Sequence, residues 1–142
     1  MAVKKTLLQL LLGAFLLSAG TSHLGSNRIE FLAQVPTWLP LDPDFVVVAS
    51  GLVEITLGVL LITTALIFKK YRAYVGVIVG VFFILIFPGN INQYINQINA
   101  FGLDTDTKRL IRLFFQPPLV AWAIWSTNSW QLVVKILSRI KK

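Results

Sequence analysis

Four long apolar runs, separated by shorter polar segments, dominate the sequence. A membrane-spanning helix needs roughly 20 mostly apolar residues. The runs therefore predict four spanning helices, at residues 7–23, 45–68, 73–90 and 110–127. The second and third runs are the most apolar, whereas the fourth contains Arg112, Gln116 and the pair Pro117-Pro118. The pattern predicts an all-α integral membrane four-helix bundle that forms a single domain over residues 1–142.

The first run also has the pattern of a cleaved secretory signal peptide. Lys4 and Lys5 would form its positively charged start, residues 7–17 its apolar core, and Ser18-Ala19-Gly20 a small-residue cleavage site. Cleavage would leave three spans, with the new N-terminus outside. The sequence leaves both interpretations open.

The segment between the first two runs, residues 24–44, is too long for a turn and too apolar for a flexible linker. Ile29, Leu32 and Val35 recur at helical spacing before Pro36, which predicts one short amphipathic helix. Trp38 follows between two prolines, as expected for an anchor at the membrane interface. We expect an outer loop that is re-entrant or interfacial, or one that only rests among the headgroups.

The third run is expected to remain helical beyond Pro88. Ile91, Ile95 and Ile98 recur at helical spacing, and Asn92, Asn96 and Asn99 fall on another stripe. We expect the isoleucine stripe to pack on the outer loop and the asparagine stripe to face water. Earlier in the same run, Gly76 and Gly80 form a GxxxG pattern, which favours a close helix contact within the protein over a dimer face.

The last segment, residues 128–142, is basic and amphipathic. Such a segment suits a helix on the inner membrane surface that attracts anionic lipid headgroups.

Composition agrees with a membrane protein. The chain is 56% hydrophobic and only 13% charged, whereas soluble domains carry roughly a quarter charged residues. It has no cysteine and one histidine, so a Cys-based zinc site or thiol redox centre is excluded and a metal site is not expected. Its net charge of +7 comes from basic residues at three separate places that flank apolar runs, so we expect no nucleic-acid partner.

The distribution of Lys and Arg predicts the orientation. With both termini inside, nine of the 13 basic residues lie on the inner side and four on the outer side. Because cytoplasmic segments carry the excess of Lys and Arg, we expect both termini in the cytoplasm. We expect a multi-pass protein in the plasma membrane of a bacterium.

Rare polar residues in the apolar runs identify a candidate site. They fall in the outer half of the predicted bundle, one or two per helix: His23, Glu54, Asn90, Arg112 and Gln116. An ionisable group at this depth is costly unless it faces the protein interior and finds partners. We therefore expect Glu54 to point inward, either paired with Arg112 or His23 or protonated.

Two further residues belong to this hypothesis. Pro88 frees a backbone carbonyl one turn earlier, which polar neighbours must satisfy. Trp38 would complete a ligand-binding set with the five polar residues. The alternative is that Glu54, Asn90 and Gln116 form a purely structural network that holds the helices together.

Several short motifs, taken in order, resemble those of DoxX-like membrane proteins. They are Ala19-Gly20-x-x-His23, Val35-Pro36-x-Trp38-Leu39-Pro40, Ser50-Gly51-x-x-Glu54-x-x-Leu57-Gly58, Phe87-Pro88-x-Asn90, and a fourth-span pattern from Arg112 through Gln116 to Trp122. The resemblance covers roughly residues 13–125. Two positions depart from the family pattern: Gly89 stands where alanine is usual, and Leu24 stands where an aromatic residue often follows the histidine.

This resemblance implies a four-helix membrane bundle that accompanies a membrane redox system. We expect an accessory subunit that binds a quinone or another lipophilic small molecule, with membrane lipids and a redox protein as partners. We assign no catalytic residue and no metal ligand, and we do not expect the chain to be an enzyme by itself. The alternative function is a non-enzymatic membrane chaperone or lipid-binding scaffold.

Overall fold

A computed structural model describes residues 2–142, and these residues form helices and connecting loops with no β-sheet. The α-helices are α1 (Ala2–Leu24), α2 (Arg28–Phe31), α3 (Pro43–Leu66), α4 (Arg72–Ile95), α5 (Asp106–Phe114), α6 (Gln116–Ser126) and α7 (Trp130–Ile140). Short 3-10 turns, η1 (Leu32–Gln34) and η2 (Lys69–Tyr71), precede the loop before α3 and the start of α4. The prediction of an all-α protein is confirmed.

Three stretches are long and apolar enough to cross a membrane. They are Ala2–Leu24, Pro43–Leu66 and Lys69–Ile95, with 23, 24 and 27 residues. They contain the first three predicted spans almost completely. Helix α3 begins where the side chain of Asp42 accepts a hydrogen bond from the amide of Phe45 and a proline occupies the first turn.

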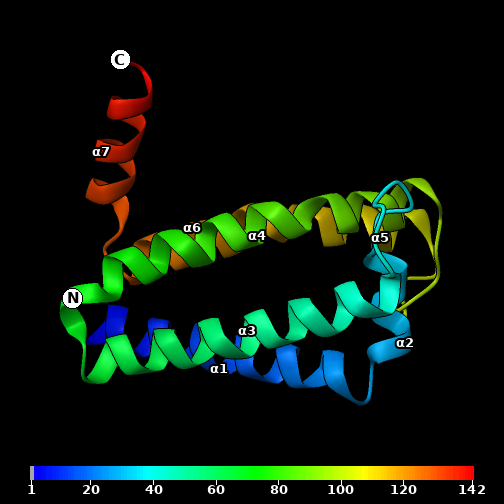
Figure 1. The fold of residues 1–142 in the computed structure, drawn as a ribbon, viewed down its shortest axis with the longest axis horizontal. Coiled ribbons are helices and arrows are strands. Elements are labelled where there is room, and N and C mark those ends of the chain that lie inside the picture. Colours follow the sequence, from blue (N-terminus) through cyan, green and yellow to red (C-terminus); the bar gives the residue numbers. More distant parts are fainter. Residues whose placement is uncertain (1) are drawn as a thin grey trace.

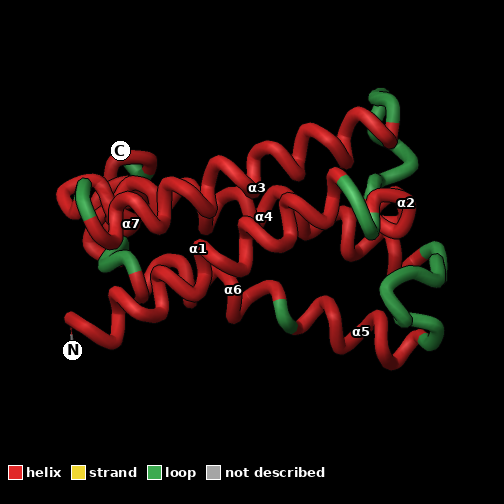
Figure 2. The backbone as a smooth tube through the Cα atoms, turned by 90° about the horizontal axis from the view of Figure 1, so that it is seen from below, coloured by secondary structure: helices red, strands yellow, loops and turns green. Residues whose placement is uncertain are grey.

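The predicted fourth helix is not continuous. The chain over residues 110–127 is divided between α5 and α6, with the break at Phe115. Pro117 and Pro118 have no N–H groups with which to bond the carbonyls four residues earlier, so the helix ends before them. Pro117 and Pro118 then open the first turn of α6, where a missing donor costs nothing. Figure 2 shows the two short helices following one another with this loop between them.

The three long helices and α6 form two antiparallel pairs. Helices α1 and α3 make the most extensive contact in the molecule, and α4 and α6 make the next. Figure 1 shows the two pairs stacked, with both termini at one end and α2 and α5 at the other. Leucine, valine and phenylalanine side chains from both pairs form the buried core, which includes Leu12, Leu16, Leu57, Leu61, Val75, Val79 and Phe83.

Glycines set the distance between α1 and α3. A Cβ at Gly20 would lie 2.6 Å from the carbonyl oxygen of Gly51, and one at Gly58 would lie 2.8 Å from that of Gly13. The backbones touch at both places, as small residues allow in lipid-embedded helices. Neither of these two glycine contacts leaves room for a residue larger than glycine.

The GxxxG pattern of α4 lies against the protein's own chain. A Cβ at Gly76 would overlap the side chains of Thr127 and Ser129, and one at Gly80 would meet Ile124 of α6. The prediction of an internal helix contact is confirmed.

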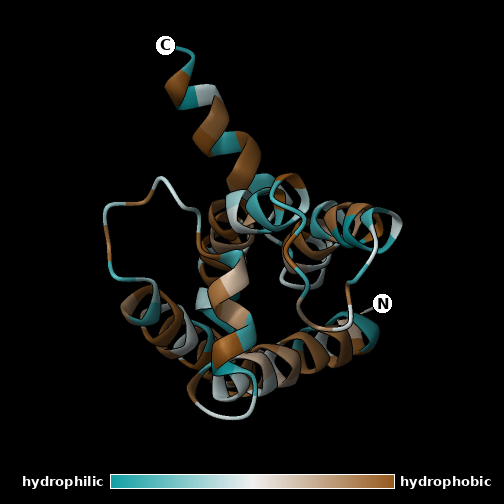
Figure 3. Cartoon of the chain, turned by 90° about the vertical axis from the view of Figure 1, so that its right-hand side faces the viewer, coloured by the Kyte–Doolittle hydropathy of each residue, from teal (hydrophilic) through white to brown (hydrophobic). Residues whose placement is uncertain are grey.

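Large apolar side chains also cover the outside of the long helices. Leu52 is 54% exposed, Ile84 58% and Leu85 70%. Figure 3, which looks onto the end with α2 and α5, shows hydrophobic colour around much of the helices. Outward apolar side chains of this size are expected where helices face acyl chains instead of water.

The outer loop contains the predicted short helix, as α2 followed directly by η1, and the chain leaves helical geometry at Val35. The prediction for the end of α4 was half right. The helix continues past Pro88 to Ile95, and Asn96 and Asn99 are exposed as predicted. However, Ile95 is 68% exposed, whereas Asn92 is buried together with Gln93.

Hydrogen bonds explain why the amides turn inward at the end of α4. Asn92 donates to the carbonyls of Ala33 and Val35 at 3.4 and 3.2 Å and accepts from the amide of Thr37 at 3.3 Å. The loop has backbone groups that must be paired once they are buried. The amide side chains of α4 supply those partners, which isoleucine cannot.

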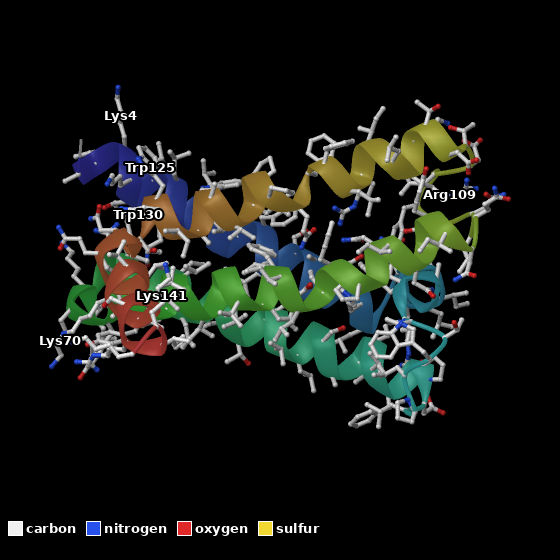
Figure 4. All side chains as sticks on the ribbon, turned by 90° about the horizontal axis from the view of Figure 1, so that it is seen from above. Lys4, Lys70, Arg109, Trp125, Trp130 and Lys141 are labelled. Atoms are coloured by element: carbon white, nitrogen blue, oxygen red, sulfur yellow. The ribbon has the colours of Figure 1, made fainter. Side chains whose placement is uncertain are left out.

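Charge is divided between the two ends of the molecule. The end with the termini, here called the basic end, carries nine cationic residues: Lys4, Lys5, Lys69, Lys70, Arg72, Lys135, Arg139, Lys141 and Lys142. Figure 4 shows Lys4, Lys70 and Lys141 there together with Trp125 and Trp130, and Arg109 at the opposite end. Helix α7 projects from the basic end at a steep angle to the long helices (Figure 1).

Candidate functional site

A cavity of about 540 Å³ lies between the helix pairs in the half of the molecule away from the termini. Helices α1, α3, α4, α5 and α6 and the segment from Asn27 to Leu39 all contribute to its wall. Most of the wall is apolar, with a small number of polar side chains that face the space. This is the usual composition of a small-molecule site.

The structure brings most of the predicted site residues to this cavity. Five of the six line it: His23, Trp38, Glu54, Arg112 and Gln116. Asn90 does not line it and is buried behind Gln116. Whether any of them holds a ligand stays a prediction.

Glu54 is buried, with 5% of its surface exposed, and faces His23. The His23 Nδ1 lies 3.2 Å from Glu54 Oε2 and 2.9 Å from the carbonyl oxygen of Ala19. Because a carbonyl only accepts, Nδ1 must carry a hydrogen and direct it to Ala19. Glu54 Oε2 is thus close to the imidazole but has no hydrogen-bond partner. A buried acceptor of this kind costs free energy until a donor reaches it.

Arg112 lies across the same cavity at the end of α5. Over residues 2–142, no hydrogen bond or ion pair joins its guanidinium to another residue. The expected direct pair between Glu54 and Arg112 is therefore not formed, and the contact of Glu54 is with His23. The wall of this cavity therefore contains an arginine without a side-chain partner among residues 2–142 and a glutamate with one buried, unpaired carboxylate oxygen.

Gln116 and Asn90 support the wall. Gln116 Nε2 donates to the carbonyl of Phe83 at 2.6 Å, and its Oε1 accepts from Asn90 Nδ2 at 3.2 Å. The carbonyl of Phe83 is adjacent to that of Ile84, which Pro88 leaves without its usual helical donor. The side-chain bond from α6 thus reaches the carbonyl next to the one that Pro88 leaves free, not that carbonyl itself. The bonds of Asn90 and Gln116 fit the alternative hypothesis, in which these amides form a network that only holds the helices together.

The outer loop forms the roof of the cavity. The Phe31 ring stacks on His23 with centroids 3.4 Å apart, and Phe101 meets Phe31 edge-on at 4.7 Å. Gly89 allows this roof to come down onto α4, because a Cβ there would lie 2.1 Å from the carbonyl oxygen of Gln34. Trp38 lines the cavity and is still 70% exposed, so it lies at the rim.

Sequence reasoning missed several polar or aromatic wall residues, among them Phe31, Gln34 and Ser50. Ser50 could have been found, because it precedes Glu54 by four residues and so shares its helix face. Phe31 and Gln34 come from the outer loop, and no periodicity indicates which way a short loop helix turns. Among residues 2–142, no group of three or more His, Cys, Asp or Glu residues is placed to hold a metal ion.

Fold and composition together define a small helical protein whose three candidate spans suggest a multi-pass membrane protein. The model of the family described as Domain of unknown function (DUF8561) matches residues 12–127. This match covers most of the chain, which therefore belongs to the DUF8561 family. No curated protein and no solved structure matches the chain.

Proposed function

We propose that this protein is a multi-pass membrane protein that binds a lipophilic small molecule in the cavity around Glu54. One observation carries the proposal: Glu54 Oε2 is buried in the cavity wall without a hydrogen-bond donor. The guanidinium of Arg112 faces the same cavity and can donate. A ligand with both a donor and an acceptor on an apolar body would satisfy the two groups together.

A quinone is the ligand class that fits this pattern best. Its carbonyl oxygens accept hydrogen bonds, which suits Arg112, and the hydroxyl of its reduced form donates, which suits Glu54. The surrounding wall of Phe, Leu, Ile and Val would hold an apolar ring and tail. The chain would then act as an accessory subunit, and a redox partner protein would supply the electron carrier.

The ordered motifs quoted above support a closer relation to DoxX-like proteins. In this proposal α1, α3, α4 and the α5–α6 pair are four spans of one bundle, with both termini in the cytoplasm. The packing of α1 against α3 supports a retained first span over a cleaved signal peptide. Phe31 supplies an aromatic ring beside His23, which offsets the leucine at position 24.

The proposal is tested by identifying the molecules that purify with the protein. The native chain, Glu54→Gln and Arg112→Gln would be extracted in mild detergent, and bound small molecules would be identified by mass spectrometry. Thr64→Val is the matched control, because Thr64 is also buried on α3 but lies outside the cavity. We expect a stoichiometric quinone in the native chain and the control, with at least tenfold less in the two cavity variants.

A native protein that carries no small molecule, or a Glu54→Gln variant that retains it fully, would overturn the proposal. Circular dichroism of each variant shows whether a loss reflects unfolding instead.

A second candidate function is that of a membrane chaperone or lipid-binding scaffold. It is favoured by apolar side chains exposed at the end with α2, where Ile29 is 82% and Leu41 52% exposed. Such a surface could receive a partner's apolar segment. A membrane protein that co-purifies in stoichiometric amount, with an empty cavity, would favour this candidate over the first.

A further inference from the structure

Helix α7 divides cleanly into a polar and an apolar face. Gln131, Lys135, Ser138 and Arg139 follow one another at the spacing of a single helix face. The other face carries Trp130, Val133, Val134, Ile136, Leu137 and Ile140, and none of the residues of α7 is buried by the rest of the chain. In water this apolar surface would be unfavourable. The chain partly covers Leu132 and Val133, and the rest of this surface requires an apolar neighbour from outside the chain.

The position of α7 is fixed by its first turn. Ser129 donates to the carbonyl of Ala73 at 2.8 Å, and Arg72 donates to that of Ser126 at 2.7 Å. Both bonds connect the α6–α7 turn to the start of α4. Helix α7 therefore leaves the bundle steeply (Figure 1). If the long helices cross a membrane, α7 lies along the membrane surface.

An apolar groove begins beneath α7. It has a volume of about 680 Å³ and extends along α4 and α6 from Gln116 and Pro117 to Trp125, Trp130 and Val133. Its walls are formed by Ile84, Phe87, Val120, Ala121 and Ile124. The groove thus leads from the middle of the long helices to the basic end. Its direction is that of an acyl chain in the leaflet on this side.

The charge at the basic end indicates that a lipid headgroup bound there would be anionic. All six acidic residues lie elsewhere: Glu54 in the cavity, and Glu30, Asp42, Asp44, Asp104 and Asp106 toward the opposite end. Over residues 2–142, no hydrogen bond or ion pair involves the side chains of Lys135 and Arg139. Lys5 lies 5.1 Å from the centre of the Trp125 ring, a pairing that suits the interfacial region.

We propose that the groove under α7 is a binding site for one anionic phospholipid of the leaflet at the basic end. One acyl chain lies in the groove against Trp125 and Trp130. The phosphate group is held by Lys135 and Arg139 with their neighbours at this end. This site shares only Gln116 with the wall of the cavity around Glu54, and it does not depend on the ligand proposed there.

The fluorescence of Trp130 tests the proposal. The chain is reconstituted in phosphatidylcholine vesicles that contain equal amounts of chain-brominated phosphatidylglycerol or chain-brominated phosphatidylcholine. The contribution of Trp130 is the difference between the native chain and Trp130→Phe. We expect stronger quenching by the brominated anionic lipid, because each surface cation favours such a lipid by roughly fivefold.

The matched variants differ only in charge. The pair Lys135→Gln and Arg139→Gln should lose the preference for the anionic lipid, whereas the pair Lys135→Arg and Arg139→Lys should keep it. Added salt should lower the preference of the native chain, which needs no variant to fold. Equal quenching by the two lipids, or a preference that survives both neutralisation and salt, would overturn the proposal.

Discussion

Single atoms decide how the roof of the cavity closes. The carbonyl oxygen of Gln34 occupies the place that a Cβ of residue 89 would need. A methyl group there must push η1 away from α4, since neither backbone has a flexible end that can move aside. Overpacking of this kind costs roughly 1–3 kcal/mol.

We therefore expect Gly89→Ala to lower the free energy of unfolding by about 1–3 kcal/mol. Thermal unfolding in detergent, followed by circular dichroism, would measure the change. Gly25→Ala is the control, because its Cβ would lie at an ordinary 3.6 Å from the carbonyl oxygen of Thr21. If the two variants unfold at the same temperature, the close contact at Gly89 is not as described.

At the scale of elements, the end of α4 holds the outer loop in place. Asn92 makes three hydrogen bonds to the backbone of residues 33–37, and the Gln34 side chain donates to Gln93 at 3.2 Å. The loop also buries Val35 and stacks Phe31 on His23, but the amide of Asn92 pairs its backbone groups.

Replacing Asn92 with alanine should release the loop. Hydrogen exchange at the amides of residues 33–37, measured by mass spectrometry, should become faster by about tenfold, as expected from the loss of one to three hydrogen bonds. Thr56→Ala, an exposed change on α3 far from the loop, should leave these rates as they are. Unchanged exchange in Asn92→Ala would show that other contacts hold the loop.

The three most apolar helices could be predicted from the sequence because helix length and hydropathy are local properties. The inward turn of Asn92 could not, because it depends on loop carbonyls about 60 residues away in the chain. The break at Phe115 was indicated by Pro117-Pro118 but was not predicted. For the cavity, Glu54 and the other polar residues of the helices could be predicted. Polar residues within apolar runs are visible in the sequence, and burying them without partners is costly. Phe31 and Gln34 could be placed only by the loop's tertiary contacts.

At the scale of the whole molecule, the side of the membrane on which the C-terminus lies depends on the α5–α6 pair. If this pair crosses the membrane, residue 138 is on the opposite side from residue 26. If it does not, the two positions are on the same side. Because the chain has no cysteine, single cysteines can report each position without interference.

We expect Ser26→Cys to react with a membrane-impermeant maleimide in intact cells. Ser138→Cys should react only after permeabilisation, because four crossings place it inside. Both side chains are exposed in the structure, so the reagent can reach them. Labelling of both positions in intact cells would rule out a fourth crossing.

The backbone contacts at Gly13–Gly58 and Gly20–Gly51 have a consequence for how a molecule would reach the interior. Two helices joined without intervening side chains move as one rigid unit. A lipid-soluble compound entering sideways from the bilayer would find its portal where one helix pair faces the other, and passage would part the pairs without opening either.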